Sequence, residues 1–103
     1  MKGNHMSGQK NYLVTGANRG LGLEFTKQIL QAGHNVYAAC RNINDIEDLD
    51  LLFGEYKDKL IVVNLDINDH NSILSLSEKL KDTSIDVMIN NAGTIGPLPY
   101  LKI

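Results

Sequence analysis

Three glycines, Gly16, Gly20 and Gly22, stand close together near the start of the chain. They follow a short apolar run, 12–14, and precede a segment, 21–32, whose apolar residues recur at helical spacing. A turn of this kind places glycine backbone at a helix N-terminus, where several N–H groups are unpaired and the helix dipole is positive. Such a site can hold the pyrophosphate of a dinucleotide. We therefore predict a phosphate-binding turn here.

The spacing of these glycines separates two kinds of phosphate loop. It reads G-x3-G-x-G and differs from the usual dinucleotide pattern, G-x-G-x-x-G. A P-loop is a poor match, because Leu23 and Glu24 follow Gly22 where Lys and Ser or Thr are required. From spacing alone, a tight strand-to-helix turn that binds nothing remains an alternative.

Two arginines favour a particular dinucleotide. Arg19 lies inside the glycine turn, and Arg41 follows the predicted strand 35–40. The end of the second strand, about 20 residues past the turn, is where the adenosine ribose is recognised. An acid there suits a free 2′-hydroxyl, whereas an arginine pairs with a 2′-phosphate, and the acidic residues from Asp45 onward come too late in the chain. We predict NADP(H) rather than NAD(H); the alternative is two solvated surface arginines.

Polar side chains also follow the third and fourth predicted strands. Asp66 comes after 60–65, at the edge where open α/β sheets bind ligands. Its alternative role is a loop or helix-capping aspartate. Asn90 and Asn91 follow the apolar run 87–89 and need hydrogen-bond partners if they are buried. Without further information, this pair is a strand-ending turn.

The segments that must position these residues alternate between strand and helix patterns. The predicted strands are 12–15, 35–40, 60–65 and 85–90, and the predicted helices are 21–32, 44–56 and 69–81, the last with Asp69 as its N-cap. This alternation indicates a parallel sheet with helices on both faces. Right-handed crossovers restrict its topology. We predict an α/β, Rossmann-like doubly wound sheet of about four strands in the order 3-2-1-4.

Composition excludes several classes of function. The chain has 103 residues, enough for one domain, with 43% hydrophobic residues and a net charge of −2. No basic face argues for nucleic acid or a membrane surface, and no apolar run is long enough to form a membrane helix.

The single cysteine, Cys40, excludes an internal disulfide and fits a reducing, cytoplasmic setting. The three histidines match no metal-ligand spacing. We predict a disordered leader, 1–10, and one domain, 11–103.

The chain resembles the short-chain dehydrogenase/reductase family in three motifs that occur in the family's order. These are the glycine turn 15–22, the aspartate Asp66 and the N-N-A-G run 90–93. The resemblance implies that Asp66 accepts a hydrogen bond from the adenine amino group, with the Ile67 backbone beside it. It also implies that Asn90 ties strands together and that Asn91, Ala92 and Gly93 border the cofactor ribose. The predicted cofactor-binding set is Gly16, Asn18, Arg19, Gly20, Leu21, Gly22, Arg41, Asp66, Ile67, Asn91, Ala92 and Gly93.

The family's reaction is NADP(H)- or NAD(H)-dependent hydride transfer between carbonyl and alcohol, using a Ser, a Tyr and a Lys, the last two as Y-x3-K. No tyrosine in this chain has a lysine four positions further on. We therefore assign no catalytic residue and expect an N-terminal, cofactor-binding portion that is inactive by itself. The alternatives are a non-catalytic dinucleotide-binding or regulatory module and an interaction protein that only keeps the fold.

A last expectation concerns partners. Nothing in the sequence pairs with the far side of the predicted strand 85–90, so this strand should lie on an open sheet edge. An apolar edge strand is a template for another chain. We expect a homo-oligomer formed through this edge or, alternatively, a poorly soluble monomer.

Overall fold

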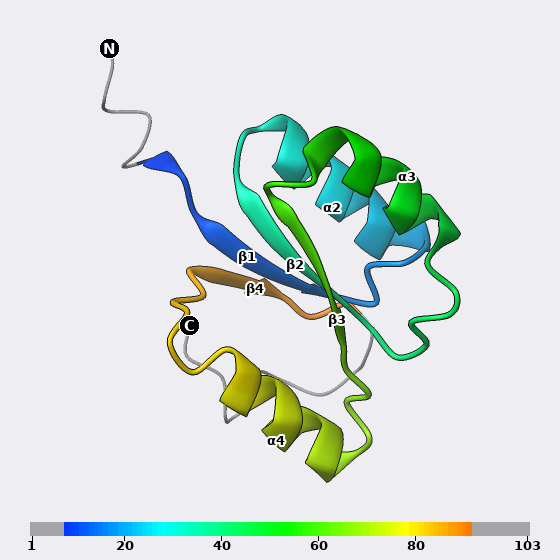
Figure 1. The fold of residues 1–103 in the computed structure, drawn as a ribbon, viewed down its shortest axis with the longest axis vertical. Coiled ribbons are helices and arrows are strands. Elements are labelled where there is room, and N and C mark those ends of the chain that lie inside the picture. Colours follow the sequence, from blue (N-terminus) through cyan, green and yellow to red (C-terminus); the bar gives the residue numbers. More distant parts are fainter. Residues whose placement is uncertain (1–7, 92–103) are drawn as a thin grey trace.

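A computed structural model describes residues 8–91 (Figure 1). The elements follow one another as β1 (Asn11–Thr15), α2 (Gly20–Gln31), β2 (Asn35–Cys40), α3 (Glu47–Tyr56), β3 (Leu60–Asn64), α4 (His70–Lys79) and β4 (Val87–Ile89). In this part of the chain the strands form one parallel sheet in the order β3-β2-β1-β4. The predicted fold class and strand order are confirmed.

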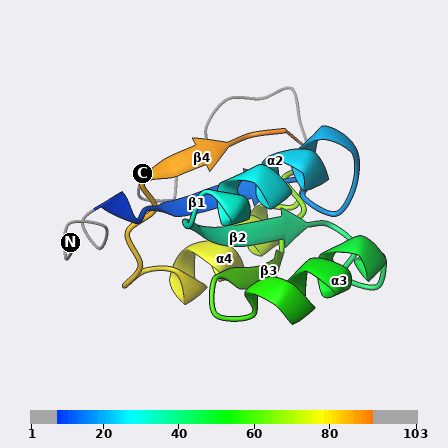
Figure 2. The same cartoon turned by 90° about the horizontal axis from the view of Figure 1, so that it is seen from above.

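Helices cover both faces of this sheet. Helices α2 and α3 lie together on one face and α4 lies on the other (Figures 1 and 2). The central strand β1 is therefore buried on both sides: Leu13 packs in the cluster that contains Ile73 of α4, and Val14 packs in the cluster that contains Leu30 of α2 and Leu49 of α3. Full burial of such a side chain contributes about 1.5–3 kcal/mol. The continuous apolar run of β1 is the sequence signature of this arrangement.

Helix α4 begins where the sequence predicts. The Asp69 carboxylate accepts a hydrogen bond from the backbone N–H of Asn71 at 3.0 Å, which confirms Asp69 as the N-cap. Helix α3 begins later than predicted, at Glu47 instead of residue 44. The reason is a turn in which the Asp45 N–H donates to the Asn42 carbonyl at 3.0 Å, so the backbone before Glu47 is committed to the turn.

Strand β4 is shorter than the predicted 85–90. Its entry is held by polar contacts to the first residue of β1. The Asp86 N–H donates to the Asn11 carbonyl at 2.8 Å, the Asn11 N–H donates to the Asp86 carboxylate at 2.8 Å, and the Asn11 side-chain amide donates to the Ser84 carbonyl at 2.9 Å. The Asp86 carboxylate thus accepts a hydrogen bond that a backbone carbonyl would accept in a regular sheet. Regular pairing therefore starts at Val87.

The extent of the predicted leader, 1–10, stays a prediction, because residues 1–7 lie outside the described part of the chain. Of its last residues, Lys10 donates its N–H to Nδ1 of His34 at 3.1 Å. Among the described helices, none has the length and apolar character needed to cross a membrane.

Candidate cofactor site

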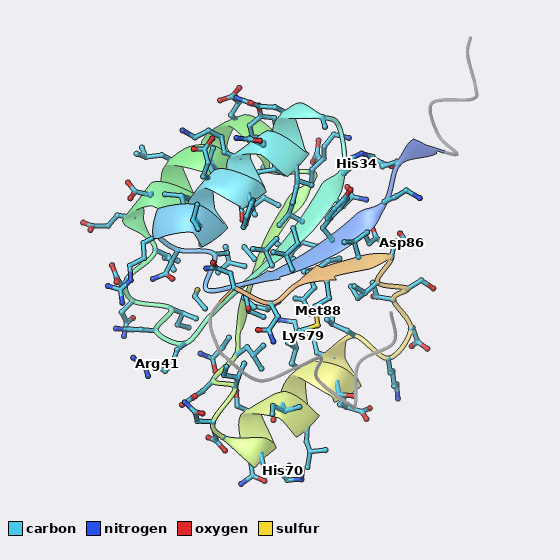
Figure 3. All side chains as sticks on the ribbon, turned by 180° about the vertical axis from the view of Figure 1, so that it is seen from behind. His34, Arg41, His70, Lys79, Asp86 and Met88 are labelled. Carbon is cyan, nitrogen blue, oxygen red and sulfur yellow. The ribbon has the colours of Figure 1, made fainter. Side chains whose placement is uncertain are left out.

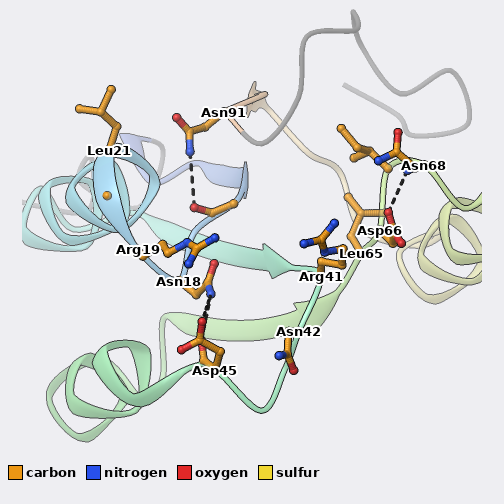
Figure 4. A pocket seen from close by; sticks show the side chains of 13 residues that line it. Asn18, Arg19, Leu21, Arg41, Asn42, Asp45, Leu65, Asp66, Asn68 and Asn91 are labelled. Carbon is orange, nitrogen blue, oxygen red and sulfur yellow. Dashed lines mark hydrogen bonds between the residues drawn. The ribbon is translucent and has the colours of Figure 1, made fainter.

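A pocket of about 620 Å³ opens at the carboxyl edge of the sheet (Figure 4). Its walls come from the β1–α2 turn, the β2–α3 loop, the β3–α4 loop and Asn91, which lies just beyond β4. The lining residues are Gly16, Asn18, Arg19, Gly20, Leu21, Arg41, Asn42, Asp45, Leu65, Asp66, Ile67, Asn68 and Asn91. Ligands of open α/β sheets bind at this edge.

The three glycines of the first turn are needed for different reasons. Gly16 and Gly20 have positive φ angles of 62° and 60°, which side chains other than glycine rarely adopt. Gly22 is buried, and a Cβ atom there would collide with the Gly16 carbonyl. A Cβ atom at Gly20, in contrast, would meet nothing within 4 Å among residues 8–91. The backbone of Gly20 is therefore open to a ligand, whereas Gly22 brings the helix close to the turn.

The N-terminus of α2 faces this open space. Its N-cap residue, Arg19, has extended backbone and forms no side-chain capping bond within the described part of the chain, and the first turn carries no acid. The first N–H groups of the helix and the positive end of its dipole are thus left for an anion. The turn itself is fixed to the sheet, because the Ala17 N–H donates to the Ala39 carbonyl at 3.1 Å.

Arg19 and Arg41 approach the pocket from two sides. Figure 4 shows Arg19 extending from the glycine turn and Arg41 from the end of β2. Both side chains are exposed, and within residues 8–91 neither forms an ion pair. The backbone of Arg41 is held in place by the Asn64 side-chain amide, which donates to the Arg41 carbonyl at 2.9 Å. Two positive charges thus remain available to a ligand.

Asp45 also lines this pocket, although it comes four residues after Arg41 in the chain. It reaches the pocket because the turn described above reverses the loop after Asn42, whose side-chain oxygen also accepts the N–H of Asn44 at 3.0 Å. The Asn18 amide donates to the Asp45 carbonyl at 2.9 Å and lies 3.4 Å from the Asp45 carboxylate.

Asp66 takes a loop-capping role with one of its oxygens. Its Oδ1 accepts the N–H of Asn68 at 3.0 Å, and its own N–H donates to the Ser72 hydroxyl at 2.9 Å (Figure 4). Within the described residues, no bond engages Oδ2. Capping of the loop and acceptance of a ligand hydrogen bond are therefore compatible at this carboxylate.

A buried hydroxyl organises the end of β4. Thr15, which is 1% exposed, donates its Oγ1–H to the Asn90 side-chain oxygen at 3.1 Å and accepts the Asn91 N–H at 2.8 Å. The Asn91 side-chain amide lies 3.4 Å from the Gly16 carbonyl. Asn90 thus ties the end of β4 to β1, as the resemblance implies, and Asn91 is carried to the rim of the pocket.

Residues 10–103 match the family model of the short chain dehydrogenases. The chain belongs to the short-chain dehydrogenase family. Retinol dehydrogenase 11 of Homo sapiens is 36% identical over 100 residues, covering 90% of this chain and 30% of that protein. NADPH-dependent 1-acyldihydroxyacetone phosphate reductase of Saccharomyces cerevisiae is 34% identical over 97 residues, covering 90% of this chain and 32% of that protein. This short-chain dehydrogenase chain thus spans about a third of the length of these curated relatives.

Solved structures give the same assignment. The fold is similar to that of a carbonyl reductase from Pseudomonas aeruginosa in complex with NADP, with a TM-score of 0.77 and 35% identity over 86% of this chain and 39% of that one. The nucleotide that the family binds is a nicotinamide dinucleotide.

Most of the predicted site residues come together. Those that line the pocket are Gly16, Asn18, Arg19, Gly20, Leu21, Arg41, Asp66, Ile67 and Asn91. Gly22 lies beneath the turn, and Ala92 and Gly93 lie outside the described residues. Sequence reasoning missed four lining residues: Asn42, Asp45, Leu65 and Asn68. The signal for two of them was available, because Asn42 and Asp45 belong to a loop rich in turn-forming side chains.

Other titratable residues lie elsewhere. Figure 3 shows His34 and His70 at opposite ends of the molecule. Within residues 8–91, no three His, Cys, Asp or Glu side chains are grouped to hold a metal ion. Cys40 is buried in the core beside the pocket. Burial raises the pKa of its thiol, and the negative charge of Asp45 raises it further.

Proposed function

We propose that this chain is the cofactor-binding part of an NADP(H)-dependent oxidoreductase that transfers hydride between a carbonyl and an alcohol. The observation that carries the proposal is the pair Arg19 and Arg41, exposed, without an ion pair among the described residues, and lining one pocket with the N-terminus of α2. A 2′-phosphate needs such cationic partners, and a planar guanidinium pairs well with phosphate oxygens.

The residues of the turn fit the pyrophosphate. No atom of the described residues lies within 4 Å of the place where a Cβ atom of Gly20 would stand, so phosphate oxygens can approach its backbone closely. The uncapped N-terminus of α2 offers N–H groups and a positive dipole end to the same oxygens. In this proposal the N–H groups of Gly20 and Leu21 hold the pyrophosphate, while Asn18 shapes the turn.

The residues of the remaining walls fit the adenosine. Asp66 keeps Oδ2 for the adenine amino group while Oδ1 caps its own loop, and the Ile67 backbone lies beside it in the pocket wall. Asn91, with the Ala92 and Gly93 that follow, borders the ribose on the side of β4. When bound, the nicotinamide of the cofactor would carry the hydride; the role of the described residues is to bind and orient its adenosine end.

Two relatives support the choice of NADP(H). The yeast relative is named as NADPH-dependent, and the similar carbonyl reductase was solved with NADP. The carbonyl or alcohol substrate class rests on family membership, and no residue among these 103 is assigned to the chemical step.

The proposal is tested by titrating NADPH and NADH into the purified chain and following nicotinamide fluorescence. We expect NADPH to bind more tightly. Arg41→Ala should lower the ratio of the NADPH affinity to the NADH affinity roughly tenfold. A hydrogen bond between charged groups contributes about 1.5–3 kcal/mol, and the exposure of this site reduces that contribution. The same substitution should weaken the binding of AMP much less than the binding of 2′-phospho-AMP.

Lys27→Ala is the matched control. Lys27 is an exposed cation on α2 that does not line the pocket, so its loss removes the same charge without touching the site. Equal affinities of the unmodified chain for NADPH and NADH would overturn the NADP(H) assignment. An equal loss of preference in Lys27→Ala would assign the effect to overall charge instead of Arg41.

A further inference from the structure

The pocket that contains the two arginines proposed to bind a phosphate also contains a carboxylate. Asp45 lines this pocket together with Arg19 and Arg41. It is exposed, and no cation within the described residues lies close enough to form an ion pair with it. Its negative charge therefore lies in the wall of the same pocket as the two arginines.

The carboxylate is not what holds the loop in place. The shorter bond from Asn18 goes to the main-chain carbonyl of Asp45, at 2.9 Å, and the carboxylate lies at 3.4 Å. The turn that carries Asp45 is closed by Asn42, whose carbonyl accepts the Asp45 N–H at 3.0 Å. The side-chain charge of Asp45 can thus be removed while the bonds that shape the loop remain.

The negative charge of Asp45 acts on groups at the end of β2. It contributes, after burial, to the raised pKa of the Cys40 thiol, the residue immediately before Arg41. A phosphate held by Arg41 would lie in the same field, where two negative groups repel each other. A ribose hydroxyl in that place is neutral and can donate a hydrogen bond to a carboxylate.

We propose that Asp45 is a specificity-determining residue that opposes the 2′-phosphate and accepts a hydrogen bond from the ribose hydroxyl, so that this pocket takes both NADP(H) and NAD(H) with only a modest preference for NADP(H). The inference rests on the proposed function, because it concerns the same site. Arg19 and Arg41 supply attraction for the phosphate, and Asp45 limits how far that attraction favours it.

The test measures 2′-phospho-AMP and AMP binding by titration calorimetry in the unmodified chain and in Asp45→Asn. Asparagine has nearly the same shape, and the main-chain bond to Asn18 does not depend on the side chain. We expect the ratio of the two affinities to shift toward 2′-phospho-AMP roughly two- to tenfold, the range for an exposed charge acting on a doubly charged group. Circular dichroism verifies the fold, and Asp45→Ser serves if the asparagine variant does not fold.

Asp48→Asn is the matched control, because Asp48 is an exposed acid in the first turn of α3 that does not line the pocket. An unchanged ratio in Asp45→Asn, with both nucleotides still bound, overturns this inference and leaves the proposed function standing. An equal shift in Asp48→Asn also overturns it, because overall charge would then explain the effect. Failure of the unmodified chain to bind either nucleotide overturns the proposed function and this inference with it.

Discussion

The carbonyl oxygen of Gly16 occupies the place where a Cβ atom at Gly22 would have to be. The Asn91 side-chain nitrogen also lies 2.9 Å from that position. The first turn of α2, the glycine turn and the rim beyond β4 therefore meet at one point. The absence of a side chain at Gly22 is what allows the helix N-terminus to come this close to the pocket.

Gly22→Ala should destabilise the protein. The Gly16 backbone has to move to make room, and overpacking of this kind costs about 1–3 kcal/mol. The free energy of unfolding from urea denaturation measures the loss. Gly54→Ala is the control: Gly54 lies inside α3 with open space around it, so alanine there should stabilise the protein by about 0.5–1 kcal/mol. A fully stable Gly22→Ala protein would contradict the close contact.

Thr15→Val should cost about 1–3 kcal/mol of unfolding free energy. The change keeps the shape of the side chain but removes the hydroxyl that accepts the Asn91 N–H and donates to Asn90. Each hydrogen bond lost costs about 0.5–1.5 kcal/mol, and the change removes the two that Thr15 makes with Asn90 and Asn91. Thr15→Ser keeps the hydroxyl and should retain the hydrogen bonds. The two variants compared by urea denaturation separate the hydroxyl from the methyl group, and equal losses would mean that the methyl group matters instead.

Stability should fall in alkaline solution, in part because of Cys40. Burial, with a smaller contribution from Asp45, raises the pKa of its thiol above the ordinary value of 9.0. Above pH 9.0 the unfolded chain gives up this proton while the folded chain keeps it, so the free energy of unfolding decreases as pH rises through the folded pKa. Below pH 9.0 the thiol contributes no slope.

Cys40→Ala should therefore show a weaker fall of the urea midpoint as the pH rises above 9.0. Tyr56 needs a parallel control, Tyr56→Phe, because its pKa is raised as well, chiefly by desolvation and then by Glu55. If the unmodified chain and Cys40→Ala lose stability in parallel over this range, Cys40 is not the group responsible.

Val87→Lys should shift any oligomer of the chain toward monomer. Within the described sheet β4 is an edge strand, and charge on an edge strand opposes pairing with a second copy. Light scattering at about 100 µM reports the mass. Ile61→Lys places the same charge on β3, the other edge of the described sheet. Dissociation by Ile61→Lys alone would assign the interface to β3, and a monomeric unmodified chain would contradict self-association altogether.

The fold was predictable because its rules are local. The apolar run of β1, the glycines that follow it and the helical spacing of α2 define a strand–turn–helix unit, and the next segments repeat the alternation. Parallel strands joined by right-handed crossovers leave few possible orders. Asp69 was recognisable as an N-cap for the same reason, since its bond to Asn71 spans only two residues.

The features that could not be predicted depend on hydrogen bonds that leave no periodic pattern in the sequence. Asp45 enters the pocket through side-chain bonds of Asn42 and Asn18, which follow no period. The start of β4 is set by Asn11, which is 75 residues away from Asp86. Thr15 has the appearance of an ordinary strand residue, and only the tertiary structure shows that its hydroxyl serves both Asn90 and Asn91.

The position of β1 between β2 and β4 has a consequence for the order of assembly. During synthesis β1, β2 and β3 can pair as soon as each has emerged, whereas the other side of β1 stays unpaired until Val87 follows. Closing so long a loop costs conformational entropy, and non-local pairing of this kind is slow. We expect β4 to join last and to detach first, with the fastest amide hydrogen exchange among the strands. Since Asn91 follows β4, the part of the pocket wall that it forms is placed only at that final step.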